Sequence, residues 1–236
     1  MSLSVVVPNF NHQKYLPECI EGILSQTHRA DEILIIDDCS TDRSVKIIQE
    51  YQRKEPRIKL IKNRENQGPS FCVNLGAKRA KGDYLAICAA DDFYLPGFFE
   101  KLMALGKKYP SAALLCSGYF DFIDCKKPYL LRDQTFITEK KECFFSPDTL
   151  VDFLWKSSFI IPSMTTIYKR KVFLNYQFDE TMKSLCDFYL NYQVALRYPI
   201  AYIQEPLGVY RIRKNSYGDK MRWALVQRSR LYTRWL

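Results

Sequence analysis

The first ninety residues alternate apolar runs with segments of helical periodicity, and this alternation constrains the fold more than any other feature of the chain. Four apolar runs of strand length cover residues 4–7, 32–37, 58–61 and 84–88. Apolar residues three or four positions apart, typical of amphipathic helices, recur in the three segments between them, at 16–24, 45–51 and 71–80. Such alternation predicts βαβ units, and therefore an α/β fold whose mainly parallel central sheet is flanked by helices on both faces.

The rest of the chain is less regular. Helices are expected over 97–109 and 186–197, and strands over 113–122, 163–167 and 207–211. Residues 123–146 follow no clear period, and we expect a variable loop region there. Because no repeat, low-complexity segment or clear linker occurs, we expect one domain over 1–216 and a tail over 217–236.

Composition excludes several classes of protein. With 47% apolar and 26% charged residues, the chain can build a core and disorder is not expected. No apolar run approaches the roughly 18–20 residues that span a bilayer, and the first residues do not resemble a signal peptide. The eight cysteines include no Cys-x-x-Cys pair and match no zinc framework. We therefore expect buried thiols in a reducing, cytoplasmic setting.

The net charge of +9 is concentrated at the C-terminal end. Residues 211–236 hold eight Lys or Arg and one acid, whereas residues 1–210 hold 27 basic and 25 acidic residues. The tail at 217–236 places apolar residues on one helical face among basic ones, which is typical of an interfacial or docking helix. We expect peripheral contact with the inner face of a membrane; packing on the core is the alternative. Nucleic acid is not an expected partner, because no binding motif accompanies the basic residues.

Polar residues follow each of the four predicted strands. They are Pro8 to Asn11, Asp37 and Asp38, Asn63 to Gly68, and Asp91 and Asp92. In open parallel sheets, ligands bind beyond the carboxyl ends of the strands, so these residues are the candidate ligand-binding residues. The carboxylates also have a simpler interpretation, because an Asp at such a turn often caps the helix that follows.

The motifs at these strand ends occur in a specific order. No Gly-x-Gly-x-x-Gly turn and no Walker loop is present, so a dinucleotide fingerprint is absent. Instead the chain contains SVVVPNFNHQ, DEILIIDDCSTDRS, NRENQG and CAADDFYLP, in that order. Together these motifs resemble the glycosyltransferase family 2 proteins, which have the GT-A fold. The resemblance covers most of residues 3–110 and resumes over 178–216.

The family resemblance implies a fold and an activity. It implies a Rossmann-like nucleotide-binding half over 1–110 and an acceptor-side half over 111–216. It also implies a divalent cation, Mn²⁺ or Mg²⁺, and transfer of a sugar from a UDP-sugar with inversion. The expected acceptor is a hydroxyl of a glycan or lipid-linked glycan, in the assembly of a surface polysaccharide.

Asp91 and Asp92 are the candidate metal ligands. Two carboxylates would repel a nucleoside diphosphate, and a cation that binds both Asp and phosphate oxygens removes this repulsion. The resemblance assigns the metal to Asp92 first and places Asp91 near the donor ribose or sugar. Relatives often have a third acid where this chain has Ala89. The alternative is that either Asp caps the helix entered through Pro96 and Gly97.

Three further strand ends are candidates for donor binding. The resemblance implies that Asp38 accepts the imide N–H of uracil and that Phe10 lies against the base, although Phe10 could also be a core residue. Pro8 would shape this loop and Asn11 would brace it. The third loop holds the candidates Arg64, Asn66 and Gly68; Gly68 lets the backbone approach the ligand, and Arg64 could meet the base or a phosphate. A polar surface turn is the alternative for this third loop.

The far end of the chain supplies a candidate base. An inverting transferase needs a general base for the acceptor hydroxyl, and the resemblance assigns it to Asp187. Cys186 stands where the family usually has a Glu. In the Tyr-Arg-x-His-x-x-Ser segment of the family, the His is replaced by Arg213, which could bind the diphosphate through a forked hydrogen bond or be a surface residue.

Two other classes of function remain open. A nucleotidyltransferase of similar fold would carry a loop rich in Gly and Arg after the first strand, and Pro8 to His12 does not resemble one. A non-catalytic sugar-nucleotide-binding subunit is the second alternative, because Ala89, Cys186 and Arg213 depart from common family residues.

Overall fold

Strands and helices alternate along the first half of the chain, as the sequence predicts. The computed structural model describes residues 1–123, 130–133, 140–157 and 159–213. The strands are β1 (Leu3–Asn9), β2 (Glu32–Asp37), β3 (Ile58–Lys62), β4 (Tyr84–Ile87), β5 (Phe93–Tyr94), β6 (Leu114–Ile123), β7 (Leu130–Asp133), β8 (Glu142–Phe145), β9 (Thr166–Lys169) and β10 (Ile200–Ile212). The helices are α1 (Leu16–Leu24), α2 (Ser44–Lys54), α3 (Pro69–Arg79), α4 (Phe98–Lys108), α5 (Pro147–Lys156), α6 (Arg170–Tyr176), the 3₁₀ segment η1 (Glu180–Leu185) and α7 (Cys186–Ala195).

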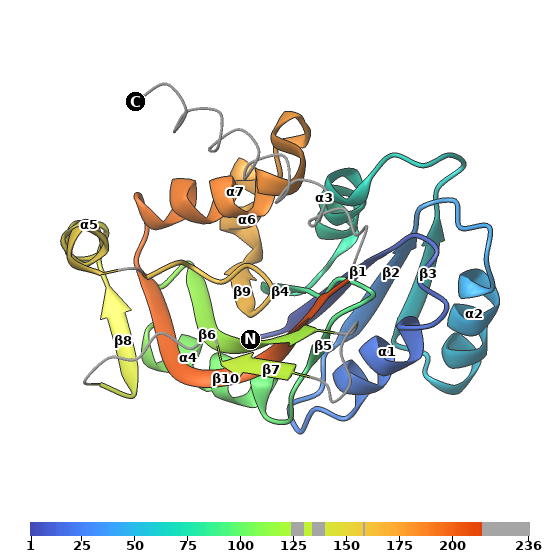
Figure 1. The fold of residues 1–236 in the computed structure, drawn as a ribbon, viewed down its shortest axis with the longest axis horizontal. Coiled ribbons are helices and arrows are strands. Elements are labelled where there is room, and N and C mark those ends of the chain that lie inside the picture. The colour runs from blue at the N-terminus through green and yellow to red at the C-terminus, as the bar shows by residue number, and fades with distance from the viewer. Residues whose placement is uncertain (124–129, 134–139, 158, 214–236) are drawn as a thin grey trace.

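A ten-stranded sheet forms the centre of the molecule (Figure 1). Its main order is β3-β2-β1-β4-β9-β6-β10-β5, with β7 paired to β6 and β8 paired to β10. The first four strands pair in parallel. Beyond β4 the sheet is mixed, because β9 runs antiparallel to both β4 and β6 whereas β10 and β6 are parallel. The predicted α/β fold with a helix-flanked central sheet is therefore confirmed, and its parallel part lies mostly in the first half.

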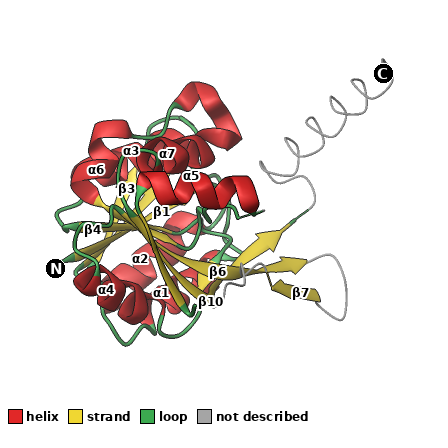
Figure 2. Cartoon of the chain, turned by 90° about the vertical axis from the view of Figure 1, so that its left-hand side faces the viewer, coloured by secondary structure: helices red, strands yellow, loops and turns green. Residues whose placement is uncertain are grey.

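Each central strand supplies side chains to two hydrophobic cores. On β1, Val5 and Val7 face the core formed with α1, α2 and α4, whereas Val6 faces the core formed with α3, α5, α6 and α7. On β2, Ile33 and Ile35 alternate with Leu34 and Ile36 in the same way. Successive side chains of a strand point to opposite faces, so both must be apolar when helices cover both faces. Figure 2 shows the two helical layers on either side of the sheet.

The second half of the chain differs from expectation. Residues 123–146 were expected to form a loop, but β7 and β8 lie within them. Strand β5 and helices α5 and α6 were not predicted, and β10 is longer than the expected strand. Short edge strands have little sequence signal, because their pairing depends on partners far along the chain. The tail at 217–236 lies outside the described residues, and no described helix is long and apolar enough to span a membrane.

The cysteines are free thiols where the structure describes them, as the sequence predicts. Five of these seven are buried, namely Cys19, Cys72, Cys88, Cys116 and Cys186. They act as small apolar side chains of the two cores.

Candidate active site

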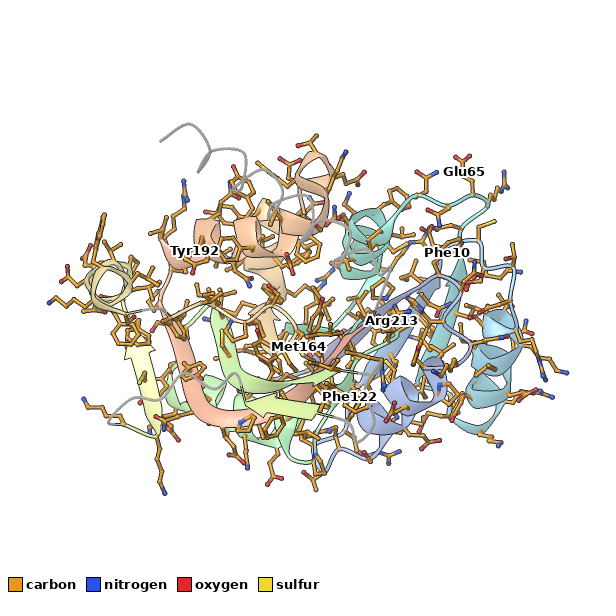
Figure 3. The ribbon with its side chains drawn as sticks, viewed as in Figure 1. Phe10, Glu65, Phe122, Met164, Tyr192 and Arg213 are labelled. Carbon is orange, nitrogen blue, oxygen red and sulfur yellow. The ribbon has the colours of Figure 1, made fainter. Side chains whose placement is uncertain are left out.

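The strand-end residues converge at one edge of the sheet. Strands β2, β1 and β4 are neighbours and run in the same direction, so the residues that follow them lie side by side. Strand β10 reaches the same edge, where the backbone N–H of Arg211 donates to a carboxylate oxygen of Asp92. Figure 3 shows Phe10 and Arg213 in this region and Glu65 on the loop that follows β3.

Asp91 pairs with Arg213. The Nε of Arg213 donates to Asp91 Oδ2 over 3.0 Å, and a second N–H of the guanidinium donates to the same oxygen. The guanidinium carbon of Arg213 also lies 4.8 Å from the centre of the Tyr15 ring. The Asp91 side chain is 16% exposed and that of Arg213 is 21% exposed, so the ion pair is only partly buried.

Asp92 is the more deeply buried of the two acids, with 3% of the residue exposed. Its Oδ1 accepts the backbone N–H of Arg211 over 2.8 Å. Burial, and then the charge of Asp91, raise the pKa of Asp92 well above its ordinary value. Helix α4 begins after Gly97 without a side-chain cap. The interpretation of these acids as helix caps is therefore wrong.

Arg211 is a residue of the site that the sequence interpretation missed. It is buried, its Nε donates to the backbone carbonyl of Asp91 over 2.9 Å, and its guanidinium pairs with Glu18 of α1. The guanidinium carbon lies 4.8 Å from the centre of the Phe122 ring. The spacing of Arg211 and Arg213 carried a signal, because residues two apart in a strand point to the same face.

Asp38 connects the end of β2 to the loop that follows β3. Its carboxylate accepts the backbone N–H groups of Gln67 and Gly68, the latter over 2.8 Å, and the side-chain amide of Asn63 over 2.7 Å. Gly68 has φ +89°, in the left-handed region that favours glycine. Asp38 therefore shapes this loop and does not cap α2.

Phe10 and Asn11 form the turn after β1. Phe10 is 41% exposed, which excludes the alternative that it is a core residue. The side-chain carbonyl of Asn11 accepts the backbone N–H of Thr41 over 2.8 Å, so Asn11 braces the turn against the loop after β2. Pro8 is half-buried within β1. These residues leave an aromatic face available beside the site.

The loop after β3 brings two further candidates to the surface. Arg64 and Asn66 are both exposed. They lie on the loop that Asp38 holds at Gln67 and Gly68. The structure thus joins this loop to the end of β2. The exposed side chains of Arg64 and Asn66 are accessible to a ligand.

Asp187 lies in the first turn of α7 and is half-buried. Its Oδ1 accepts the backbone N–H of Phe188 over 2.7 Å. Burial raises the pKa of Asp187 above its ordinary value, although hydrogen bonds from Phe188 and Ser163 oppose this effect. A carboxylate with a raised pKa is a better proton acceptor than an exposed one.

Two contacts hold the segment that leads into α7 against α3. The Ser70 hydroxyl on α3 lies 3.1 Å from Cys186 Sγ, so the residue before Asp187 touches the first turn of α3. One turn later, Asn74 exchanges two hydrogen bonds with the backbone of Phe178. Because α3 begins directly after Gly68, these contacts connect the Asp187 region to the loop held by Asp38.

Comparison with known proteins identifies the class. A family model described as glycosyl transferase family 2 matches residues 4–176, and the chain therefore belongs to glycosyltransferase family 2. It is 29% identical to the glycosyltransferase GlyA of Streptococcus pneumoniae serotype 4 over 237 residues, which cover 95% of this chain. The chain spans 33% of the length of GlyA. The family resemblance expected from the sequence is thus confirmed.

Solved structures show the same fold. The chain is similar to S. aureus TarS 1–349 in complex with UDP-GlcNAc, with a TM-score of 0.75, 20% identity, and coverage of 92% of this chain and 60% of that one. It is also similar to the mannosyltransferase PcManGT from Pyrobaculum calidifontis in complex with GDP-Man and Mn²⁺. That likeness has a TM-score of 0.65 and 17% identity, and covers 91% of this chain and 58% of PcManGT. These likenesses confirm the expected fold.

Proposed function

We propose that this protein transfers a sugar from a UDP-sugar to an acceptor hydroxyl, with inversion at the anomeric carbon, during surface polysaccharide assembly. The observation that carries the proposal is the presence of two reachable carboxylates with different environments. Asp91 lies at the end of β4 against a guanidinium, whereas Asp187 is half-buried and has a raised pKa. The first suits the diphosphate side of the donor, and the second suits a general base.

The donor would lie across the ends of β1 and β2. The exposed ring of Phe10 offers a face on which a base can stack. Asp38, whose carboxylate holds the neighbouring loop through three donors, would accept the base N–H. Arg213 donates from Nε and one further nitrogen to Asp91 and would offer its remaining N–H groups to the diphosphate. Arg64 and Asn66 border the same region. TarS, which shares this fold, was solved with UDP-GlcNAc.

The acidic pair fits a hard divalent cation. In the described part of the chain, no three His, Cys, Asp or Glu side chains gather into a metal-holding group, so the protein would supply one or two carboxylates. Mg²⁺ and Mn²⁺ suit such sites, because they take carboxylate oxygens and keep further ligands from water and substrate phosphates. The family resemblance assigns the metal to Asp92 first, but Asp92 is enclosed, so we propose that the more accessible Asp91 makes the first contact. The cation would stabilise negative charge on the departing diphosphate.

The acceptor would approach from α7. Asp187 takes the proton of the acceptor hydroxyl as the oxygen attacks the anomeric carbon from the side opposite the diphosphate, which produces inversion. The two residues that follow, Phe188 and Tyr189, are exposed. Their rings offer apolar surface to the faces of an acceptor sugar.

The proposal is tested by a thermal-shift screen of nucleotide sugars with and without Mn²⁺, followed by turnover with the donor that binds. Asp91→Asn should remove the Mn²⁺-dependent part of the shift. Asp187→Asn should keep donor binding and lose about 10²–10⁴-fold in turnover, the usual worth of acid–base catalysis. Asp152→Asn, which alters an exposed acid on α5, is the matched control and should behave as wild type.

The two alternatives predict other results in this experiment. A nucleotidyltransferase would release pyrophosphate from a nucleoside triphosphate and a sugar phosphate. A pure binding subunit would bind the donor without transfer or hydrolysis. Full turnover in both Asp91→Asn and Asp187→Asn would contradict the site assignment.

A further inference from the structure

The hydroxyl of Ser40, in the loop after β2, holds both neighbours of Phe10. Its Oγ accepts the side-chain amide Nδ2 of Asn9 over 3.2 Å and the backbone N–H of Asn11 over 3.0 Å. A hydroxyl oxygen has two acceptor lone pairs, and each of them serves one residue beside Phe10. A single atom of the β2 loop therefore fixes the turn after β1 on both sides of the candidate stacking ring.

Asp37 links Ser40 and Asn9 a second time. Asn9 and Asp37 are paired in register at the ends of β1 and β2, and both are buried. The Nδ2 of Asn9 donates to Asp37 Oδ2 over 2.8 Å, and the backbone N–H of Ser40 donates to Asp37 Oδ1 over 3.1 Å. Because an ionised carboxylate can only accept, the Asn9 amide must turn its N–H groups toward Asp37 and Ser40. The three residues thus close a ring of hydrogen bonds.

The same contacts hold two strained backbone positions. Asn11 has φ +57° and Cys39 has φ +65°, in the left-handed region that is uncommon for residues other than glycine. Such conformations persist where surrounding contacts determine them, and they gather at ligand-binding sites. Ser40 directly follows Cys39 and accepts the backbone N–H of Asn11. One residue therefore joins the two strained positions.

We propose that Ser40 is a positioning residue that sets the direction of the Phe10 ring for stacking on the base of the donor. The ring is 41% exposed. An exposed ring is not fixed by core packing, so its direction depends on the backbone that carries it. A turn held before the donor arrives does not have to be ordered by binding, which favours affinity. The inference rests on the proposed function, in which Phe10 contacts the base.

The effect of Ser40 should be specific to the base half of the donor. We would measure binding of UDP and of pyrophosphate by calorimetry with Mg²⁺ present. Ser40→Ala should weaken UDP binding roughly fivefold to tenfold, the usual worth of one hydrogen bond or two, and leave pyrophosphate binding unchanged. Ser40→Thr keeps the hydroxyl and should restore UDP affinity. Ser25→Ala removes a hydroxyl that bonds to a backbone carbonyl at the end of α1 and is the matched control.

Turnover and stability provide two further readouts. The KM for the donor should rise in Ser40→Ala by the same factor as the UDP dissociation constant, while kcat stays constant, because stacking on the base is equally strong in the ground state and the transition state. Urea unfolding shows whether the variant is folded. If Ser40→Ala does not fold, Ser40→Cys replaces it, because a thiol is close in size but a weak acceptor.

A double variant shows whether Ser40 acts through Phe10. Once the ring is removed in Phe10→Leu, adding Ser40→Ala should change UDP affinity by less than about twofold. Independent, multiplying losses would overturn the positioning role. So would equal weakening of UDP and pyrophosphate, or wild-type UDP affinity in Ser40→Ala, and in those cases a loss of UDP affinity in Phe10→Leu leaves the proposed function intact. If Phe10→Leu itself binds UDP like wild type, the stacking assignment of the proposed function fails, and the positioning role fails with it.

Discussion

The contact between α3 and β1 at Gly76 gives a quantitative test of how the fold supports the site. A Cβ atom at Gly76 would lie 2.4 Å from Cγ1 and 2.9 Å from Cγ2 of Val6. Val6 is fully buried, and β1 is paired on both sides, with β2 and β4. Because the strand cannot retreat, Gly76→Ala must push α3 away from the sheet.

The size of the effect follows from two opposing contributions. Overpacking of a core costs about 1–3 kcal/mol, and the close approach to both methyl groups places Gly76→Ala near the upper end. Alanine recovers up to about 1 kcal/mol through its higher helix propensity. The expected loss in free energy of unfolding is therefore about 2 kcal/mol. For a chain of this size, Tm should fall by about 4–8 °C.

The same displacement should weaken the donor site. Helix α3 begins directly after Gly68, whose N–H bonds to Asp38, and its first turn carries Ser70, which contacts Cys186. An outward shift of the helix strains both contacts. We therefore expect UDP binding to weaken in Gly76→Ala, although no residue that faces the donor has changed.

Urea unfolding of Gly76→Ala, Val6→Ala and the double variant tests the steric argument. Val6→Ala removes the two methyl groups that the new Cβ would meet, so the double variant should be more stable than the sum of the single effects by about 1 kcal/mol or more. Additive effects within about 0.5 kcal/mol, or a Gly76→Ala variant as stable as wild type, would refute the reasoning.

Three further predictions concern other parts of the chain. Asp38→Ala should lower the free energy of unfolding by about 1–3 kcal/mol, because it leaves the donors of the 63–68 loop without their acceptor. Urea unfolding measures this loss of stability, and a UDP titration measures the accompanying loss of affinity. An unchanged UDP affinity would contradict the proposal that Asp38 binds the base. The Arg57 guanidinium lowers the pKa of Glu55 to about 2. Glu55→Gln should therefore lower the free energy of unfolding by up to ~1 kcal/mol at pH 7. The difference in stability between wild type and Glu55→Gln should vanish as the pH falls from 4.5 through about 2. A constant difference across this pH range would show that the ion pair with Arg57 does not stabilise the fold. Finally, the chain should float with anionic vesicles at low salt and a 1–216 truncation should not; equal flotation would exclude a role for the tail.

The sequence alone was enough to predict the parallel half of the fold and the strand-end residues. Apolar runs such as 32–37 report local burial on both faces, and each is followed by polar residues that the parallel pairing of β1, β2 and β4 necessarily places at one edge. The order of the motifs was enough to identify the family. These features are encoded within short stretches of chain, so periodicity and spacing reveal them.

Only the tertiary structure decided how the acids are partnered. Arg211 and Arg213 lie 119 and 122 residues after the acids Asp92 and Asp91 that they contact, and Ser70 and Cys186 are 116 residues apart. Those contacts depend on where β10 and α7 lie in the folded chain, which no local pattern reports. Burial then separates two adjacent carboxylates into an accessible Asp91 and an enclosed Asp92. Their difference arises from long-range packing, because their positions in the sequence are nearly equivalent.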